Sequence, residues 1–276
     1  MELSAQYAHP VGEKGLVNIY YAPVGDVALG PTAFPHRASA MELPQATLAH
    51  HWQDTTHIAN NLVTAGFQYS KVRLEASGFR GREPNENRWN IDFGPMDSWS
   101  GRLSVFPTRN WMAQVSTGRL KQPEQFHRDD VVRTTASIHH VLPRSNGNYW
   151  AASFIWARNY KTIEKHATQA LVAEAVAPLG RRNFVTGRYE WSQRDELFEN
   201  DHDLGHEIEE RTGKHAFGVN GITAGYTRDV SLVRNLQSGV GFNVTRYFID
   251  EALRPYYGSR PWGVSVFVRF RLRPTE

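Results

Sequence analysis

The most regular feature of this sequence is an alternation of apolar and polar residues near its C-terminus. From Gly263 to Arg273, every second residue is apolar, in the order Val264, Val266, Val268, Phe270 and Leu272. Successive side chains of a β-strand point to opposite faces, so the stretch predicts a strand with one apolar face. The other face ends in three arginines. A strand of about ten residues is the length needed for a tilted crossing of a bilayer.

The same two-residue period recurs through the rest of the chain, with hydroxyl, glycine and charged residues at the intervening positions. It predicts an all-β protein of about thirteen strands. The period alone does not say which face turns outward, so a soluble β-sandwich remains an alternative. The clearest apolar runs are Val63, Ala65, Phe67 and Tyr69; Trp99, Leu103 and Val105; Val132, Ala136 and Ile138; Val185, Tyr189 and Trp191; and Leu236, Val240, Phe242 and Val244.

The connections between these runs alternate strictly between short and long. This alternation is typical of an antiparallel transmembrane β-barrel, whose periplasmic turns are short and whose extracellular loops are long. Short turns are expected near residues 10–14, 70–72, 107–110, 143–147, 178–182 and 228–234. Long connections are expected at residues 25–60, 81–97, 121–130, 159–165, 193–214 and 250–260.

The composition agrees with a membrane barrel and excludes several other classes of protein. The mean hydropathy is −0.52, and no stretch approaches the roughly 20 consecutive apolar residues of a membrane helix. The chain has no cysteine, which excludes disulfides and thiolate metal sites. Its net charge of +3 comes from interspersed charges of both signs, unlike the concentrated basic face of a nucleic-acid-binding protein.

The N-terminal residues Met1–Tyr7 contain no basic region, apolar core or cleavage site of a signal peptide. Bacterial single-chain barrels normally have an even number of strands, whereas the pattern gives about thirteen. We therefore expect that the chain begins at an internal methionine, after a signal peptide and one further strand. The complete protein would have about fourteen strands, and residues 1–276 would form one domain.

Several local motifs make the sequence resemble a family of porin-like outer-membrane β-barrel proteins of Gram-negative bacteria. The resemblance implies a location in the cell outer membrane, contact with lipids and lipopolysaccharide, insertion by the barrel-assembly machinery, and passage of small solutes. It implies no defined activity. The motifs lie at Met1–Tyr7, His50–Trp52, Thr56–Ile58, Leu74–Pro84, Arg88–Asn90, Arg102–Ser104 and Gly118–Lys121.

Charged residues at the polar positions of the strands are the first candidate functional set. They are tolerable in a polar interior but costly against lipid. They predict a porin-like channel for small polar or anionic solutes, whose charges select what passes. The alternative is a closed structural barrel held by ion pairs. The set comprises Arg73, Glu75, Arg102, Arg133, His139, Arg188, Glu190, Arg269 and Arg271, with Glu174 beside them.

Histidines in the first long connection are the second candidate set. His50, His51, Asp54 and His57 lie close together in the sequence, and such ligands can bind Cu or Zn. Their spacing matches no fixed geometry, so these side chains could equally hydrogen-bond within a loop that folds over or into the barrel. A metal-handling binding protein is therefore the alternative function, and no other cofactor is expected. A weaker cation cluster is Asp201, His202, Asp203, His206 and Glu207.

Nothing in the sequence points to an enzyme. A membrane phospholipase needs a serine, a histidine and an amide or acid on one outer face. His140 is the histidine expected to face outward well inside the chain, and no partner serine accompanies it. The pair Arg188 and Glu190 fits a lumen as well as it fits acid–base chemistry.

Overall fold

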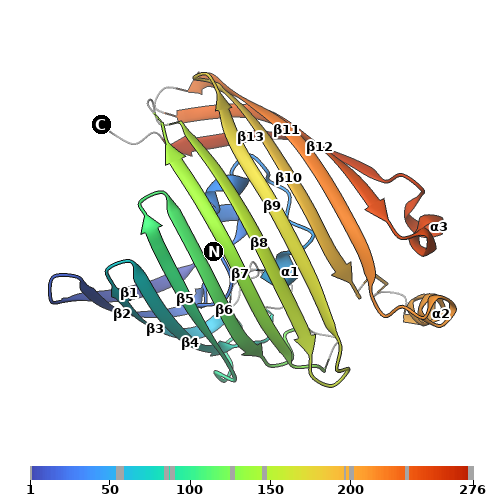
Figure 1. Ribbon diagram of the computed structural model, residues 1–276, viewed down its shortest axis with the longest axis horizontal. Helices are drawn as coiled ribbons and strands as arrows, with labels where there is room; N and C mark the ends of the chain where they lie inside the picture. Colours follow the sequence, from blue (N-terminus) through green and yellow to red (C-terminus); the bar gives the residue numbers. More distant parts are fainter. Residues whose placement is uncertain are drawn as a thin grey trace. The chain divides into compact units, whose positions relative to one another are not determined.

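The computed structural model describes residues 2–53, 59–83, 87, 91–124, 128–144, 148–195, 197–198, 202–233 and 236–272. These residues form thirteen strands in one sheet, and each strand is hydrogen-bonded to the strand that follows it in the sequence (Figure 1). The prediction of about thirteen strands is confirmed. The strands are β1 (Leu3–Val11), β2 (Gly15–Gly25), β3 (Ala59–Tyr69), β4 (Val72–Arg80), β5 (Ser98–Thr108), β6 (Trp111–Leu120), β7 (Val131–Pro143), β8 (Tyr149–Lys161), β9 (Ala167–Leu179), β10 (Asn183–Arg194), β11 (Phe217–Val233), β12 (Leu236–Ile249) and β13 (Trp262–Leu272).

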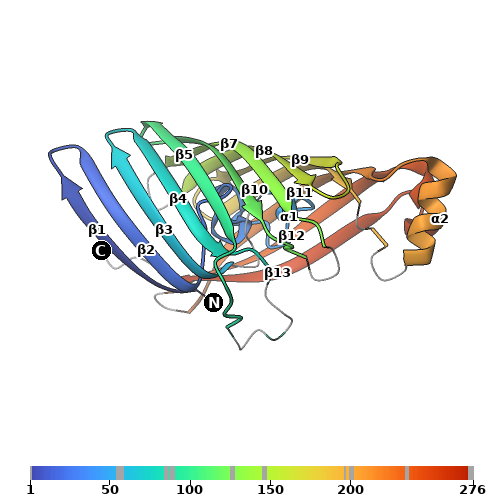
Figure 2. The same cartoon turned by 90° about the horizontal axis from the view of Figure 1, so that it is seen from below.

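The connections alternate in length as the sequence predicts, except after β8. Short turns join β1 to β2, β3 to β4, β5 to β6, β7 to β8, β9 to β10 and β11 to β12, and most of the intervening connections are longer (Figure 2). The long connection predicted at residues 159–165 is wrong, because β8 continues to Lys161 and leaves only residues 162–166, no more than the turn at residues 144–148. The longer connections carry short helices that the strand pattern does not predict. These are η1 (Phe34–His36), η2 (Ala38–Ala40), α1 (His50–Gln53), α2 (His202–Thr212), η4 (Glu251–Leu253) and α3 (Arg254–Tyr257).

The two faces of the sheet are inverted relative to a water-soluble protein. On β13, Val266 is 74 % exposed, and its apolar neighbours on the same face are also exposed. On the opposite face of the sheet, Thr135 is fully buried and Asn243 is 1 % exposed. A water-soluble protein does not expose so large a contiguous apolar surface, because contact of that surface with water is unfavourable. The burial pattern therefore excludes a soluble β-sandwich and fits strands whose exposed face contacts lipid.

The chain divides into two compact units. In the first unit, Ala22, Leu62 and Phe79 of the strands pack with Val27 and Leu29 of the connection after β2. In the second unit, one apolar cluster lies on the buried face of β8–β10 and another lies among the long connections. The first unit comprises residues 1–33, 50–139 and 155–169, and the second comprises residues 34–49, 140–154 and 170–276.

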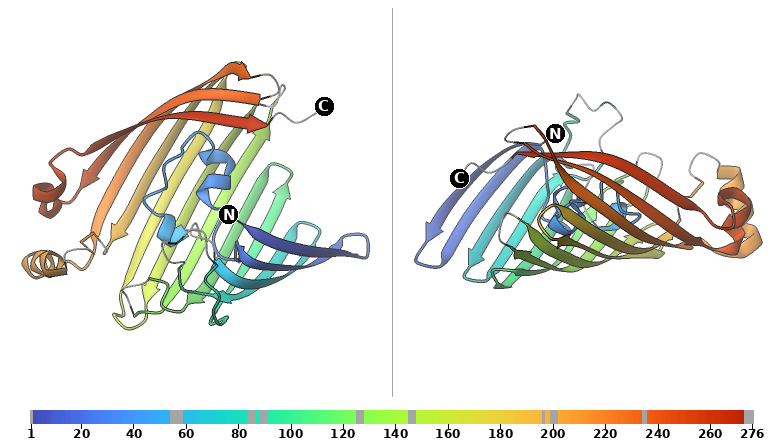
Figure 3. Two further views of the ribbon diagram at one scale, coloured as in Figure 1. Left: turned by 180° about the vertical axis from the view of Figure 1, so that it is seen from behind. Right: turned by 90° about the horizontal axis from the view of Figure 1, so that it is seen from above.

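The connection after β2 folds against the buried face in each unit. In the first unit, the amides of Ala28 and Gly30 donate to the hydroxyls of Ser77 (2.9 Å) and Ser116 (2.8 Å). In the second unit, residues Phe34–Ala49, which we call the docked segment, lie over β9 and β10 (Figure 3). Side chains of the strands thus form hydrogen bonds with backbone groups of this connection, which are not paired with a neighbouring strand.

The connections before β11 and before β13 pack together in the second unit. Ile208 of α2, Phe217 at the start of β11 and Leu253 of η4 form a buried apolar cluster. The Tyr257 hydroxyl donates to the carbonyl of Leu197 at 3.0 Å, which joins the two connections. Within the described residues, none of the helices is long and apolar enough to cross a membrane.

Candidate functional site: charged side chains on the buried face

The centre of the site is an ion pair between neighbouring strands. Glu174 on β9 and Arg188 on β10 are register partners, so their side chains leave the sheet side by side on the same face. Glu174 Oε2 lies 2.9 Å from Arg188 Nε, and both side chains are buried. The two-residue period of the strands, which places apolar residues on the exposed face, thus places both charges on the buried face.

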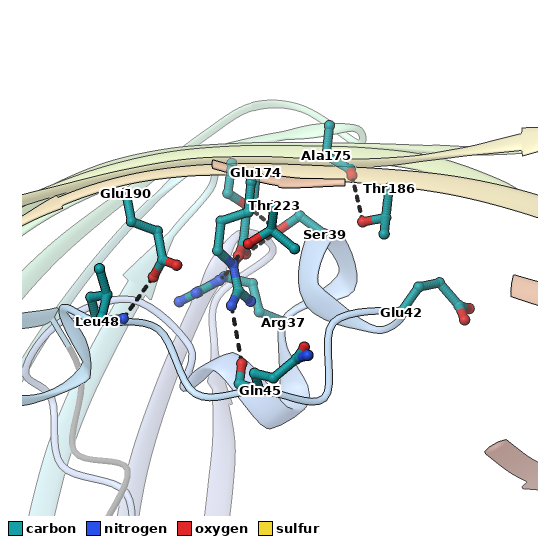
Figure 4. Close-up of polar contacts among 12 residues, drawn as sticks. Arg37, Ser39, Glu42, Gln45, Leu48, Glu174, Ala175, Thr186, Glu190 and Thr223 are labelled. Atoms are coloured by element: carbon teal, nitrogen blue, oxygen red, sulfur yellow. Dashed lines mark hydrogen bonds and ion pairs between the residues drawn. The ribbon is translucent and has the colours of Figure 1, made fainter. Parts of the chain in front are cut away.

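The docked segment adds a second cation to the same carboxylate. Arg37 Nε lies 2.6 Å from Glu174 Oε1, and the Ser39 hydroxyl donates to that oxygen at 2.8 Å (Figure 4). Ser39 Oγ also lies 2.6 Å from Ser153 Oγ on β8. A buried carboxylate is stable only when it is paired and hydrogen-bonded, and both oxygens of Glu174 meet this condition. We call Arg37, Ser39, Glu174 and Arg188 the first latch.

Backbone groups of the docked segment bind the same strand. Arg188 Nη1 donates to the Gln45 carbonyl at 3.0 Å, and Arg194 Nη1 donates to the Leu48 carbonyl at 2.9 Å. The Leu48 amide donates to the Glu190 carboxylate at 2.7 Å (Figure 4). Three charged residues of β10 therefore satisfy backbone groups that have no strand to pair with.

A second group of charges, the second latch, holds the middle of the docked segment. The carboxylate of Glu42 is fully buried and pairs with Arg269 and with Arg271 Nη2, the latter at 2.8 Å. Arg269 also pairs with Asp229 on β11. Asn243 Nδ2 donates to the Glu42 carbonyl at 3.3 Å. The last two strands thus grip Glu42 through both its side chain and its backbone.

The first unit has a smaller set of charges on its buried face. Arg102 Nε lies 3.0 Å from Glu75 Oε2, and Arg102 Nη1 donates to the Gly30 carbonyl at 3.1 Å. Arg133 Nε donates to Asn159 Oδ1 at 3.0 Å. These contacts pair or hydrogen-bond each charge within the unit.

All nine charged residues predicted from the strand pattern lie on the buried-face side of their strands. Two of them contact neutral side chains: His139 Nε2 is 2.8 Å from Ser137 Oγ, and Arg73 Nη2 donates to Gln68 Oε1 at 2.7 Å. Four of them, in the second unit, meet the docked segment, namely Arg188, Glu190, Arg269 and Arg271. Their role in selecting solutes stays a prediction.

The strand pattern does not reveal the partners that these residues meet. Arg37 and Glu42 belong to a long connection, where a two-residue period carries no information. Asp229 falls within the turn predicted near residues 228–234, whereas the structure places it in β11, paired with Gly239 of β12. One signal does point to the docked segment: it contains several alanines and leucines and few charges, a composition that suits a packed connection better than a solvated loop.

The structure describes half of the predicted metal set. His50 and His51 belong to α1, and their rings meet edge to face with centroids 4.1 Å apart. His51 Nδ1 lies 3.6 Å from Glu83 Oε1. Asp54 and His57 lie outside the described residues. Among the residues that are described, no three His, Asp or Glu side chains gather as metal ligands would.

The weaker candidate for a cation-binding cluster, at residues 201–207, is also described only in part. His206 and Glu207 lie on the exposed side of α2. The side chains of Asp201, His202 and Asp203 lie outside what the structure describes. The metal alternative gains no support from these positions, and it remains a prediction.

Comparison with known proteins identifies the fold. No protein-family model matches the sequence, and no curated protein matches it. An anion-selective porin from Comamonas acidovorans is similar in structure, with 11 % identity, 90 % of this chain and 79 % of that chain covered, and a TM-score of 0.51. OmpF of Salmonella typhi, in a complex with daunomycin, is similar with 11 % identity, 98 % and 89 % coverage, and a TM-score of 0.56.

These likenesses and the inverted faces of the sheet define the class of protein. The chain has the all-β antiparallel fold of the outer-membrane β-barrels, in which alternate strand residues face lipid. Its exposed apolar face fits the bacterial outer membrane, where such barrels reside.

Proposed function

We propose that the protein is a porin-like channel that lets small polar solutes cross the outer membrane, with a preference for anions. In a barrel of this class, the face opposite the lipid lines the lumen. Here that face carries hydroxyl, amide and charged side chains. Charged side chains that line a lumen sort ions and small solutes by charge.

The observation that carries the proposal is the arrangement of the two latches. Each central carboxylate is shared by two guanidiniums: Glu174 lies between Arg37 and Arg188, and Glu42 lies between Arg269 and Arg271. Asp229 adds one further carboxylate. These side chains therefore comprise four cations and three anions, and the surplus positive charge supports a preference for anions.

Single-channel recording in planar bilayers tests the proposal directly. The refolded protein is expected to give steady current steps, and the reversal potential in asymmetric KCl is expected to have the sign for chloride. Arg271→Gln removes the latch cation whose side chain is 20 % exposed, so it should shift the reversal potential toward that of potassium. Arg254→Gln, on the surface helix α3, is the matched control and should leave the reversal potential unchanged.

Two results would contradict the proposal. A correctly folded, heat-modifiable protein that carries no current would support a closed structural barrel instead. Current that favours potassium in the wild type would leave a channel but remove the preference for anions.

Adding Cu²⁺ during the recording also tests whether the connection that contains His50 and His51 affects conduction.

A further inference from the structure

In each latch, one sheet residue that contacts the docked segment is also paired with another sheet residue. Glu174 accepts Arg37 from the segment, but it also pairs with Arg188 of the sheet. Arg269 donates to Glu42 of the segment, but it also pairs with Asp229 of the sheet. Each latch therefore contains a sheet–sheet ion pair that does not depend on the segment.

This duplication changes the cost of removing the segment. Breaking a buried ion pair is normally costly because one charge stays behind, buried and uncompensated. If the segment leaves, Glu174 keeps Arg188 and Arg269 keeps Asp229. Arg271 loses its carboxylate, but its side chain is already 20 % exposed and can be hydrated.

Release of the segment also leaves none of its own charged side chains buried without a partner. Arg37 and Glu42 move with the segment into water, where both are readily solvated. The hydrogen bonds of its backbone to Arg188, Glu190 and Arg194 exchange for bonds to water, a change with a small net free energy for each bond.

Apolar contacts hold the docked segment only weakly. The hydrophobic residues that it buries most fully are small, apart from one leucine: Ala40, Leu43 and Ala49. Ala38 packs partly buried against Ala151, Val176 and Phe184. Alanine side chains lose little on transfer to water compared with larger apolar ones. The attachment of the segment is therefore mainly polar, and polar attachments are reversible in a hydrated lumen.

We propose that residues Phe34–Ala49 form a releasable plug, which switches the channel between a low-conductance state with the plug docked and a high-conductance state with the plug released. The proposal rests on the proposed channel function. The sheet is suited to both states, because its own ion pairs Glu174–Arg188 and Asp229–Arg269 remain formed in each.

A reversible crosslink tests the plug. The chain has no cysteine, so introduced thiols are unique. Ser39 Oγ and Ser153 Oγ are 2.6 Å apart, one on the segment and one on β8, so Ser39→Cys with Ser153→Cys places two thiols in contact. The oxidised double variant is expected to stay in the low-conductance state. Reduction with dithiothreitol should restore transitions to the high-conductance state.

A second cysteine pair within the sheet is the matched control. Thr223 on β11 and Thr245 on β12 are register partners whose hydroxyl oxygens are 2.8 Å apart. Thr223→Cys with Thr245→Cys joins two sheet strands and leaves the segment free. Oxidation and reduction of this variant should not change the two conductance levels or the transitions between them.

The single variant Glu42→Gln tests the inference without a crosslink. It weakens the second latch but leaves the Asp229–Arg269 pair in place. The fraction of time in the high-conductance state is expected to rise by roughly tenfold relative to the wild type. Arg254→Gln is again the control and should leave this fraction unchanged.

The possible results separate the plug from the channel. If the oxidised Ser39→Cys/Ser153→Cys protein conducts with the same levels and transitions as the reduced protein, the plug is wrong and the channel stands. Failure of these thiols to crosslink under oxidation would contradict the docked position, and with it the plug. If neither the wild type nor any variant conducts, the proposed function fails first and the plug fails with it.

Discussion

Glu174 and Arg188 face each other directly across β9 and β10, and their buried side chains meet at 2.9 Å. The pair serves two purposes at once. It neutralises two charges on the buried face of the sheet, and it offers the remaining carboxylate oxygen to Arg37 of the docked segment. The strand register therefore determines where the segment can dock.

Removal of the shared carboxylate should strongly destabilise the second unit. Glu174→Gln removes the buried carboxylate that both Arg37 and Arg188 contact, and we expect a loss of about 3–5 kcal/mol in the free energy of unfolding. Urea titration of the refolded protein in detergent, followed by tryptophan fluorescence, measures the change. Glu251→Gln is the control, because that side chain is 83 % exposed. Equal stabilities of the two variants would contradict the role of Glu174.

The exposed face should reject charge if it contacts lipid. Val266 lies in the middle of β13 and is 74 % exposed. Val266→Arg is expected to cost about 2–4 kcal/mol in a bilayer, whereas Val266→Leu should be close to neutral. Folding into lipid vesicles, measured by the heat-modifiable gel shift, gives both values. A face exposed to water would accept arginine at this position without penalty, and that result would overturn the lipid-facing assignment.

Gly225 should be sensitive to substitution because of its neighbour across the strand. A Cβ atom at this position would collide with Asn243 Oδ1, and Asn243 holds the Glu42 carbonyl. Gly225→Ala should displace Asn243 and increase protease cleavage within the docked segment. At Gly187, on the adjacent strand, an added Cβ meets its nearest atom, Thr223 O, at 3.8 Å. Gly187→Ala is thus the matched control, and identical cleavage of the two variants would rule out this mechanism.

The contact between the two long connections of the second unit should weaken in acid. Asp250, just after β12, accepts a hydrogen bond from Lys214, and this bond lowers the pKa of the Asp250 carboxyl below its ordinary value. A lowered folded-state pKa stabilises the contact at pH values above the ordinary pKa of Asp. The stabilisation is lost as the pH falls through the folded-state pKa.

Hydrogen exchange of the Ala252 amide, which donates to Asp250 Oδ1 at 3.0 Å, reports this contact. Wild-type protection should fall as the pH drops below about 4, after correction for the intrinsic rate. Asp250→Asn should show lower protection at neutral pH and little further change in acid. Glu210→Gln, at an exposed position of α2, should behave as the wild type does. A pH response retained in Asp250→Asn would assign it to another group.

The strand pattern predicts most of the sheet because its physical cause is local. Val266 and Arg269 are an odd number of residues apart, so their side chains point to opposite faces of β13. Every strand with lipid on one side needs the same alternation of apolar and polar residues. The same reasoning places Arg188 and Glu190 on the buried face, with no knowledge of what they meet. Turn positions follow from proline, glycine and charged residues between the alternating runs.

The docked segment could not be predicted in the same way. The position of Arg37 depends on Glu174, and that of Glu42 depends on Arg269, both far away in the sequence. No short-range period encodes such contacts. The folding of α2 is also hidden, because Ile208 is buried in a cluster with Phe217 and Leu253, which lie outside the helix. Helices in long connections arise from tertiary packing more than from local pattern.

The position of Glu42 in the chain has a consequence for how the protein reaches its native state. Glu42 and Arg269 are separated by 227 residues, and Arg269 lies on the thirteenth strand. The second latch therefore cannot close until that strand has paired with β12. Contacts of such high sequence separation form late and slow folding. Until then, the docked segment lacks its contact with Arg269. Completion of the sheet is therefore the step that fixes the charged side chains on its buried face.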